Sequence, residues 1–424
     1  MNEIVNDEMH IENFSPKDIM DINSGLIDHK VSVASEYIQY IIKHGFVMRE
    51  VRSAAASKVK MADLVTDETR EVLMFGSNNY LGLANEPSII KQVVEAVKEF
   101  GIGCGGPPLL NGTTSLHKKL EKKLAEFKKC DDAILFSSGY SANVGWVTGL
   151  LSKGDYLVYD NQNHASLHDG IKMGDFTGIG FAHNDLVQLE EKLQFVREQD
   201  PDANVITAVE GVYSMDGDIS PLPAIKRLCL NYNSMLFIDD AHGVGVVGKT
   251  GKGTTEHYNM DGQVDIVMGT FSKTFGVTGG YIAGSQQMID YLRLFARSHM
   301  FSASLPPSVI AAVLGGIEFI EKNPGRIKQL HENVAYFVEG LNTLGFETTN
   351  HTAIIPVFLA EEVDIMTVVK ELYNEGIFVN GVEYPAVPKN RHRLRVSMMS
   401  TFSREELDFA LSVFEKVGKK LNLI

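Results

Sequence analysis

Cysteine is scarce in this chain of 424 residues, which contains only Cys104, Cys130 and Cys229. Three widely spaced cysteines exclude a disulfide framework and leave no CxxC pair for a metal or a redox centre. The HExxH pattern is also missing, so no metal is expected. The opening segment, MNEIVNDEMH, lacks the basic and apolar stretches of a secretory signal. The sequence therefore predicts a cytoplasmic protein.

Positive charge and long apolar runs are also in short supply. Lysine and arginine number 39 against 54 acidic residues, which gives a formal net charge of −15. The basic residues are scattered along the chain, so a nucleic acid is not an expected partner. No apolar run approaches the roughly 18 residues of a membrane span. The most apolar stretch, residues 309–317, is typical of a buried helix, and membrane contact is expected to be peripheral at most.

Short apolar segments alternate with helical patterns through the middle of the chain. The segments AILFSS, YLVYD, VITAVEG, MLFIDD, DIVMGT and GYIAG have the length of buried strands. Their alternation with amphipathic stretches predicts an α/β fold with a mostly parallel sheet, covered by helices on both faces. The stretch EPSIIKQVVEAVKEFG predicts a helix with Pro87 in its first turn and Gly101 just past its end.

Changes in this pattern divide the chain into three parts. Residues 1–70 are predicted to form an N-terminal arm and a linker that leads into a small hairpin. Residues 71–305 contain the strand-rich pattern and are predicted to form the large, ligand-binding domain. Residues 306–424 combine longer helices with a few strands, which predicts a smaller C-terminal α+β domain.

The stretch DDAHGVGVVGKT at residues 239–250 matches two nucleotide-binding patterns, the phosphate loop and the dinucleotide fingerprint. Both patterns require a helix directly after the glycines. Here Gly251 and Gly253 would fall in the first turns of that helix, each at a cost of about 1 kcal/mol relative to alanine. We therefore expect a glycine-rich turn that leaves a strand. Functional residues are expected just upstream, at Asp239, Asp240 and His242, because open α/β sheets bind ligands at strand ends.

Four stretches together supply the parts of one cofactor site, although each alone is more often structural. Lys273 lies between a buried strand and a glycine-rich segment, which predicts a desolvated amine suited to imine formation. Residues 137–139, Ser-Ser-Gly, lie at a strand-to-helix junction that suits a phosphate. A carboxylate of the stretch MLFIDDAH can keep a heterocyclic nitrogen protonated, and His164 can stack on an aromatic ring. An amine, a phosphate cradle, a carboxylate and an imidazole are what pyridoxal 5'-phosphate (PLP) needs.

In these stretches the chain resembles the α-oxoamine synthase family of fold-type-I PLP enzymes, and within that family the bacterial serine palmitoyltransferases. The similar motifs run in family order from residue 45 or so to the C-terminus: FGSNNYLGL, NGTTSLHKKLE, ILFSSGYSAN, NHASLHDG, EGVYSMDGDISPLP, IDDAHGVGVVGKTGKG, GTFSKTFG, FSASLPP and RLRVSMM. The resemblance implies a mostly parallel seven-stranded sheet in the large domain. It also implies PLP as the cofactor, and a homodimer whose active sites are shared between subunits.

The resemblance assigns roles to individual residues. Lys273 would bond to the cofactor aldehyde and later move the substrate Cα proton, while Asp239 would pair with the pyridine nitrogen. His164 would stack on the ring, and His242 and Ser214 would bond the phenolic oxygen. The predicted phosphate ligands are Ser138, Gly139, Tyr140, Thr270 and Ser272, completed across the dimer interface by Ser302 or Ala303. The predicted ligands of the amino-acid carboxylate are Asn78 and Arg395.

The implied reaction is the decarboxylating condensation of an amino acid with an acyl-CoA. L-Serine and a long-chain acyl-CoA are the expected substrates, which would give 3-ketodihydrosphingosine in a first step of sphingolipid-type synthesis. The alternative is a synthase for glycine, alanine, threonine or cysteate, like 2-amino-3-ketobutyrate CoA ligase or 8-amino-7-oxononanoate synthase. Two further classes are another PLP enzyme of this fold, such as an aminotransferase, and an inactive partner subunit. The presence of Lys273 speaks against the last of these.

One departure from the family pattern concerns specificity. Pro107 and Pro108 stand where serine palmitoyltransferases typically have Ser-Arg. The change removes a cationic donor and stiffens the backbone near the expected substrate channel. The identity of the amino acid and the length of the acyl chain therefore stay open.

Overall fold

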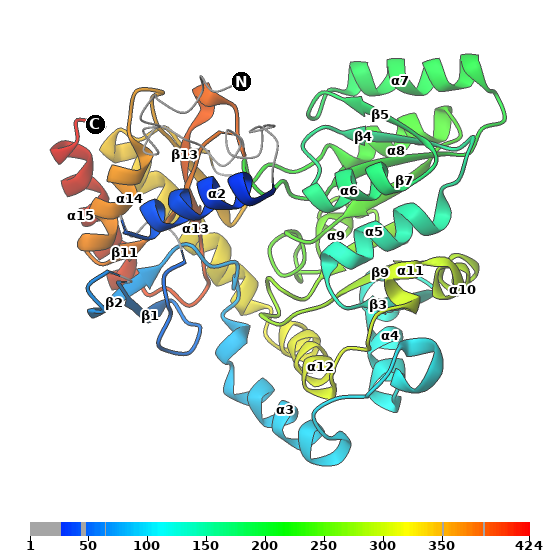
Figure 1. Cartoon of the computed structure of the whole chain (residues 1–424), viewed down its shortest axis with the longest axis horizontal. Coiled ribbons are helices and arrows are strands. Elements are labelled where there is room, and N and C mark those ends of the chain that lie inside the picture. The colour runs from blue at the N-terminus through cyan, green and yellow to red at the C-terminus, as the bar shows by residue number, and fades with distance from the viewer. Residues whose placement is uncertain (1–26, 44–47, 64, 350–351, 385) are drawn as a thin grey trace.

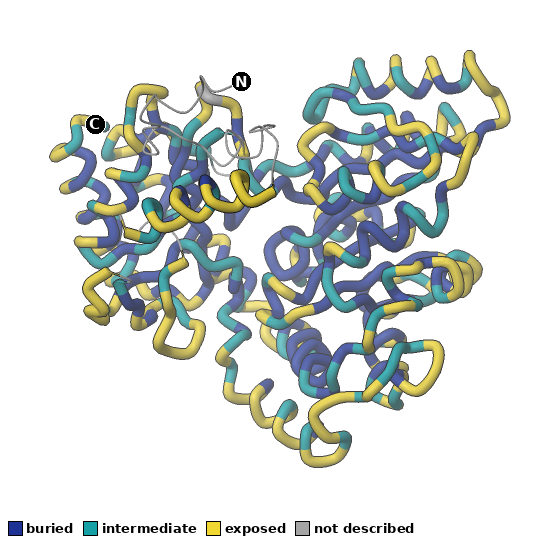
Figure 2. Tube along the Cα trace, viewed as in Figure 1, coloured by how far each residue is buried: buried dark blue, intermediate teal, exposed yellow. Residues whose placement is uncertain are grey.

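The computed structural model describes residues 27–43, 48–63, 65–349, 352–384 and 386–424. The predictions for the segment before residue 27 lie outside these ranges. In the described part, one group of elements is built on a large sheet, and a second group consists of the C-terminal helices with two small sheets (Figure 1). Helix α2 (Ile27–Lys43) is mostly exposed, with only Val33 and Tyr37 buried (Figure 2).

A seven-stranded sheet forms the centre of the first group. Its strand order is β3-β9-β8-β7-β6-β4-β5, and all neighbours are parallel except β9, which runs antiparallel to β3 and β8. This arrangement confirms the predicted mostly parallel seven-stranded sheet. The strands are β3 (Asp132–Phe136), β4 (Tyr156–Asp160), β5 (Thr177–Phe181), β6 (Val205–Glu210), β7 (Met235–Asp239), β8 (Ile266–Thr270) and β9 (Gly280–Gly284).

Strand β5 was not predicted from the sequence. Its residues, TGIGF, include two glycines and lack the continuous apolar run that marks the other six strands. The strand lies at the edge of the sheet, and four of its five residues are exposed or half-buried. An edge position does not require the apolar side chains that a buried central strand requires, so the sequence signal is weak.

Helices cover both faces of this sheet because successive side chains of a strand point to opposite sides. On one face, Phe237 of β7 packs against Trp146 of α5 (Gly139–Leu150), with ring centroids 4.1 Å apart. On the other face, Ile238 packs in a core with residues of α7 (Leu186–Gln199) and α8 (Leu222–Asn231). Further helices of this group are α4 (Ser115–Lys128), α6 (Ala165–Met173), α9 (Thr254–His257), α10 (Gln286–Phe295) and α11 (Arg297–Met300).

Helix α3 (Pro87–Phe100) begins and ends where the sequence predicts. Pro87 is its first residue, and Gly101 follows it with a φ of 77°, which glycine adopts without strain. The helix packs against α12 (Pro307–Lys322). Ile90 and Val94 on its outer side are each 45% exposed, which leaves an apolar strip on the surface of the single chain.

The second group combines two small sheets with α13 (Gly325–Leu344), α14 (Ile365–Asn374) and α15 (Arg404–Lys420). One sheet has the order β1-β2-β11, in which the expected hairpin of β1 (Lys58–Ala62) and β2 (Thr69–Met74) gains a parallel neighbour, β11 (Ile377–Phe378). The other has the order β10-β13-β12, with β10 (Ile354–Phe358), β12 (Asn380–Val382) and β13 (Arg393–Ser397). The predicted boundaries at residues 70 and 305 stay predictions.

Candidate active site

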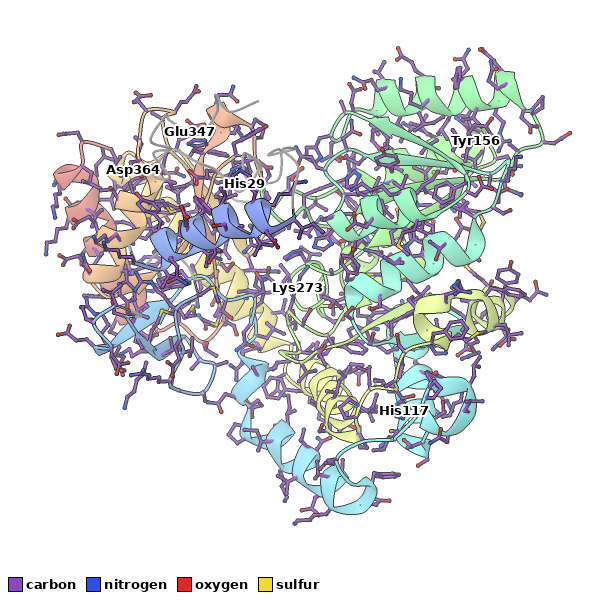
Figure 3. The ribbon with its side chains drawn as sticks, viewed as in Figure 1. His29, His117, Tyr156, Lys273, Glu347 and Asp364 are labelled. Carbon is purple, nitrogen blue, oxygen red and sulfur yellow. The ribbon has the colours of Figure 1, made fainter. Side chains whose placement is uncertain are left out.

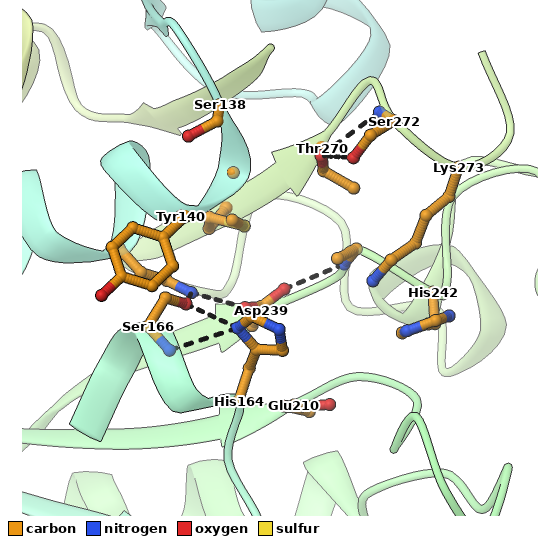
Figure 4. Close-up of a pocket in the computed structure, with 14 residues that line it drawn as sticks. Ser138, Tyr140, His164, Ser166, Glu210, Asp239, His242, Thr270, Ser272 and Lys273 are labelled. Atoms are coloured by element: carbon orange, nitrogen blue, oxygen red, sulfur yellow. Dashed lines mark hydrogen bonds between the residues drawn. The ribbon is translucent and has the colours of Figure 1, made fainter. Parts of the chain in front are cut away.

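A cavity lies where the central strands of the large sheet end. Strands β6, β7 and β8 are parallel neighbours that finish at Glu210, Asp239 and Thr270. The strand-end cavity has a volume of about 220 Å³ and is shown in Figure 4. Its walls are formed by Ser138, Gly139, Tyr140, Asn143, His164, Ser166, Glu210, Asp239, Ala241, His242, Met268, Thr270, Ser272 and Lys273. Open α/β sheets bind ligands at this edge.

Lys273 reaches the strand-end cavity from the loop after β8. Figure 3 places it near the centre of the view, between the two groups of elements. Burial lowers the pKa of its amine to about 8, although the carboxylates of Asp239 and Glu210 oppose the change. At pH 7 this amine is therefore neutral in a far larger fraction of molecules than a lysine in water, and the neutral amine is the nucleophile.

Asp239 faces the cavity from the end of β7 and is held by two donors. Its Oδ2 accepts a hydrogen bond from Nδ2 of Asn143 at 2.8 Å, and its Oδ1 accepts one from the backbone N–H of Ala241 at 3.0 Å. Trp146 donates its indole N–H to Oδ1 of Asn143 at 3.2 Å. Because the amide oxygen is occupied by this bond, the amide nitrogen of Asn143 is turned toward Asp239.

His164 belongs to the same hydrogen-bond network. It caps α6, with Nδ1 accepting from the backbone N–H of Ser166 at 3.2 Å and from its hydroxyl at 2.7 Å. The hydroxyl oxygen of Ser166 in turn accepts from Nδ2 of Asn143 at 2.9 Å. Burial lowers the pKa of His164, with the charge of Asp239 acting against it. The ring is therefore neutral, which suits packing on a flat ligand.

The N-terminus of α5 borders the cavity and suits an anion. Ser138 caps this helix, and its Oγ accepts a hydrogen bond from the N–H of Ser141 at 3.0 Å. A Cβ on Gly139 would stand 3.0 Å from Oγ1 of Thr270, so a larger residue would be crowded there. The hydroxyls of Thr270 and Ser272 lie 2.7 Å apart on the adjoining wall. A helix N-terminus carries partial positive charge and free N–H groups, as a phosphate requires.

Strand β13 of the second group brings Arg395 to Asn78. The Nη1 of Arg395 donates to Oδ1 of Asn78 at 3.2 Å, and its Nε donates to the carbonyl oxygen of Ser214 at 2.5 Å. The Tyr80 hydroxyl lies 3.2 Å from the same oxygen of Asn78 and 2.7 Å from Nδ1 of His242. Burial lowers the pKa of His242 well below its ordinary value, and neighbouring cations add to the effect. This polar corner suits a carboxylate.

The structure places two other predicted residues as follows. Ser214 contributes its carbonyl oxygen to Arg395, and the residue is not part of the cavity wall. Tyr140 lies in the wall, is 48% exposed, and donates its hydroxyl to Oδ2 of Asp169 at 2.6 Å. The predicted bonds of these residues to a cofactor stay predictions.

Ser302 and Ala303 do not reach the strand-end cavity of their own chain. They line a separate cavity together with Ser137 and His117. Their predicted contact with the phosphate site of a second subunit is therefore compatible with their position and stays a prediction.

Four residues with polar side chains at the site were not found from the sequence. They are Asn143, Ser166 and Glu210 in the cavity wall and Tyr80, which contacts His242. Asn143 lies four residues after Gly139, so the two share a face of α5, and this spacing was an available signal. Glu210 shares a register position with Asp239 on the neighbouring strand, and no sequence pattern reveals that pairing.

The glycine-rich segment after Asp239 encloses a buried ion pair. Lys128 and Asp240 are fully buried, and Nζ of the lysine lies 2.7 Å from Oδ2 of the aspartate. A Cβ at Gly243 or at Gly253 would stand 1.9 Å from an oxygen of this carboxylate. The next helix, α9, begins after these glycines and has only four residues. The predicted glycine-rich turn after the strand is therefore confirmed, and the glycines make room for a buried side chain.

The groups that line the strand-end cavity fit the phosphate, the pyridine nitrogen and the aldehyde of PLP. A helix N-terminus with nearby hydroxyls suits the phosphate. A carboxylate held by two donors suits the pyridine nitrogen, and a lysine amine with a lowered pKa suits the aldehyde. In addition, Oε1 of Glu210 is buried without a hydrogen-bond partner among the described residues.

Comparison with known proteins agrees with this chemistry. The family model of aminotransferase class I and II matches residues 70–414. Fold and cavity together define the chain as a fold-type-I PLP-dependent enzyme. Similar synthases and solved structures narrow this class: the chain belongs to the α-oxoamine synthase family, and its cofactor is PLP.

The relatives carry two names. The 8-amino-7-oxononanoate synthase of Thermosipho melanesiensis is 42% identical over 356 residues, which cover 84% of this chain and 90% of the relative. The synthase of the same name from Thermoanaerobacter pseudethanolicus is 40% identical over the same shares. Among solved structures, a serine palmitoyltransferase of Sphingomonas wittichii superposes with a TM-score of 0.88 at 31% identity. That superposition covers 95% of this chain and 100% of the other.

Two kinds of feature are absent from the described residues. None of the helices in the described ranges has both the length and the apolar character needed to cross a membrane. The same ranges contain no group of three or more histidine, cysteine, aspartate or glutamate side chains arranged to hold a metal ion.

Proposed function

We propose that this enzyme condenses an amino acid with an acyl-CoA thioester and releases CO₂, and that alanine is the amino acid. The relatives named 8-amino-7-oxononanoate synthase, at 40% and 42% identity, support this choice. In the product that gives them their name, a methyl-bearing amine carbon adjoins a ketone. Alanine would leave that arrangement after losing its carboxylate. The alternative in the sequence analysis is therefore favoured over serine with a long-chain acyl-CoA.

The observation that carries the chemistry is that Lys273 and Asp239 line one cavity of about 220 Å³. In our proposal, the Lys273 amine would hold the cofactor at its aldehyde and would take the proton from the substrate Cα. The Asp239 carboxylate would accept a hydrogen bond from the pyridine nitrogen and keep it protonated. When bound, PLP supplies the electron sink that makes the Cα carbon a nucleophile.

The remaining side chains would orient the substrates. Arg395 and Asn78 would bind the amino-acid carboxylate, because a guanidinium fork matches its two oxygens. His164 would pack on the ring of the cofactor and limit its movement. Ser138, Gly139, Thr270 and Ser272 at the start of α5 and the end of β8 would hold the phosphate.

Serine remains the second candidate. The serine palmitoyltransferase of Sphingomonas wittichii superposes on 95% of this chain with a TM-score of 0.88. A solved 8-amino-7-oxononanoate synthase of Francisella tularensis superposes less closely, with a TM-score of 0.70 at 25% identity. Structural similarity thus favours serine as the substrate, whereas sequence identity favours the reaction of the 8-amino-7-oxononanoate synthases.

We also infer that the enzyme works as a homodimer. Ile90 and Val94 are each 45% exposed, and Phe301, next to Ser302, is 70% exposed. Apolar side chains exposed in this way are typical of surfaces that another chain covers. Light scattering on the purified protein should give twice the mass of the chain, and a monomer that is fully active would contradict the inference.

A panel of substrates tests the proposed reaction. The purified protein should be yellow with PLP, and alanine with acyl-CoAs of graded length should release free thiol and CO₂ faster than serine, glycine, threonine or cysteate. Lys273→Ala should fold and lose this activity. Transfer of the amino group without release of CO₂ would indicate an aminotransferase, and a protein that takes up no PLP would overturn the proposal.

A further inference from the structure

Glu210 is a buried carboxyl group that the proposed reaction leaves without a role. It ends strand β6, lines the strand-end cavity and is 3% exposed. Its Oε1 has no hydrogen-bond partner in the part of the chain that the structure describes. A buried polar atom left unpaired costs about 1–3 kcal/mol, so its presence in the wall of a ligand cavity calls for a partner that the ligand supplies.

Asp239 is the carboxyl group that lies beside Glu210 on the neighbouring strand. Glu210 and Asp239 occupy the same register position on adjacent parallel strands, so their side chains leave the sheet on the same face. The carboxylate of Asp239 already receives two hydrogen bonds, from Asn143 and from the backbone of Ala241. Two carboxyl groups at such close range do not both ionise readily, and the one that receives more donors keeps the charge.

The other groups near Glu210 do not change which of the two carboxyl groups keeps the negative charge. Burial is the main cause that raises the pKa of Glu210 well above its ordinary value, and the charge of Asp239 is the second. Asp160 acts in the same direction, while Lys273 and the backbone N–H of His164 oppose it. No ion pair joins Lys273 to Glu210 within the described residues, and the pKa of that amine is itself lowered.

We propose that Glu210 remains a neutral carboxylic acid and donates its O–H to an oxygen atom of the ligand, on either the cofactor or the amino acid. The inference rests on the proposed function, because it requires PLP or an amino acid in this cavity. Figure 4 shows Glu210 among the side chains of His164, Asp239 and His242. A neutral acid in this place adds a donor to the cavity wall without a second negative charge beside Asp239.

Three variants separate this role from a structural one. Glu210→Gln keeps a neutral donor, Glu210→Leu removes it at similar size, and Thr207→Val is the matched control. Thr207 lies on the same strand, and its hydroxyl pairs with Ser234 instead of lining the cavity. We expect Glu210→Leu to weaken the binding of PLP or of the amino acid, read from the absorbance of the bound cofactor, by about tenfold or more. Glu210→Gln and the control should stay within about threefold of the wild type.

Titration with and without the amino acid identifies the acceptor. If Glu210→Leu loses affinity for PLP alone, the hydrogen bond is assigned to an oxygen of the cofactor. If the variant loses affinity only when the holoenzyme is titrated with alanine or serine, the hydrogen bond is assigned to the substrate. If Glu210→Gln binds as weakly as Glu210→Leu in both titrations, the group acts as a charged carboxylate and the proposal is overturned.

Infrared spectroscopy of the cofactor-free protein tests the protonation state directly. The wild type and Thr207→Val should show the carbonyl band of a protonated carboxyl group near pH 7, and Glu210→Gln should lack it. No difference between these spectra would overturn the proposal, even if Glu210→Leu fails to fold. Because this measurement needs no cofactor, it remains decisive if the protein does not bind PLP, a result that would count against the proposed function alone.

Discussion

Removing the cation from the buried ion pair next to the candidate active site should destabilise the protein strongly. In Lys128→Met, the apolar stem keeps its packing but the ammonium is lost. Both Lys128 and Asp240 have side chains with 0% exposure, and Nζ also donates to the carbonyl oxygen of Lys252 at 2.5 Å. Burial alone would lower the pKa of Lys128, and Asp240 outweighs this effect and raises it. The lysine is therefore charged at every pH at which the protein is handled.

The size of this destabilisation depends on the hydrogen-bond donors that remain around the Asp240 carboxylate. Breaking a fully buried pair by removal of one partner costs about 3–5 kcal/mol. Asp240 keeps two donors from Thr254, its hydroxyl at 2.7 Å and its N–H at 3.1 Å. These donors compensate part of the uncovered charge, so we expect the lower end of the range, about 3 kcal/mol in the free energy of unfolding.

A double-mutant cycle in urea measures this cost. Asp240→Asn in combination with Lys128→Met should recover at least about 2 kcal/mol of the loss, because no uncompensated charge remains. Lys98→Met is the matched control, since Lys98 and Glu95 form an ion pair in which both side chains are more than 60% exposed. Such a pair contributes little. A loss in Lys128→Met no larger than that in Lys98→Met would refute the reasoning.

Four further predictions concern the site and its surroundings. Gly243→Ala should cost about 1–3 kcal/mol because its Cβ would stand 1.9 Å from Oδ1 of Asp240, whereas Gly103→Ala, with open space around it, should be neutral in the same urea titration. Burial acts to lower the pKa of His183, but its two carboxylate partners raise it to about 10 from 6.5. Its stabilisation is complete below pH 6.5 and is lost as the pH rises through 10, so the difference in melting temperature between the wild type and His183→Gln should shrink over that interval. Uptake of PLP by the cofactor-free protein should accelerate with pH and level off above about 8, the pKa of Lys273, and a rate that still rises steeply at higher pH would contradict this. Asn143→Leu should weaken PLP binding by about tenfold or more in an absorbance titration, because the carboxylate at the end of β7 loses a donor.

The parts of the site that the sequence revealed are those that lie next to strand ends along the chain. Asp239 is the last residue of β7, and Lys273 follows the end of β8 by three residues. A buried strand is visible as an apolar run, and a ligand site at its carboxyl end follows from the geometry of parallel sheets. For the same reason the fold class was predictable, and the edge strand β5, which has no such run, was not.

Contacts between distant segments were decided by the tertiary structure. Arg395 reaches Asn78 across 317 positions of the chain, and Lys128 pairs with Asp240 across 112. The register that sets Glu210 beside Asp239 also depends on how two strands align.

Sequence patterns report local conformation and burial, which are properties of a few neighbouring residues. They therefore determined the strands, the helices and the positions of Lys273 and Asp239 beside strand ends. Packing alone determined which distant side chains share a hydrogen bond or a charge. The glycines that follow Asp239 illustrate the difference. Their spacing matches a phosphate loop in the sequence, but in the folded protein they make room for the buried carboxylate of Asp240.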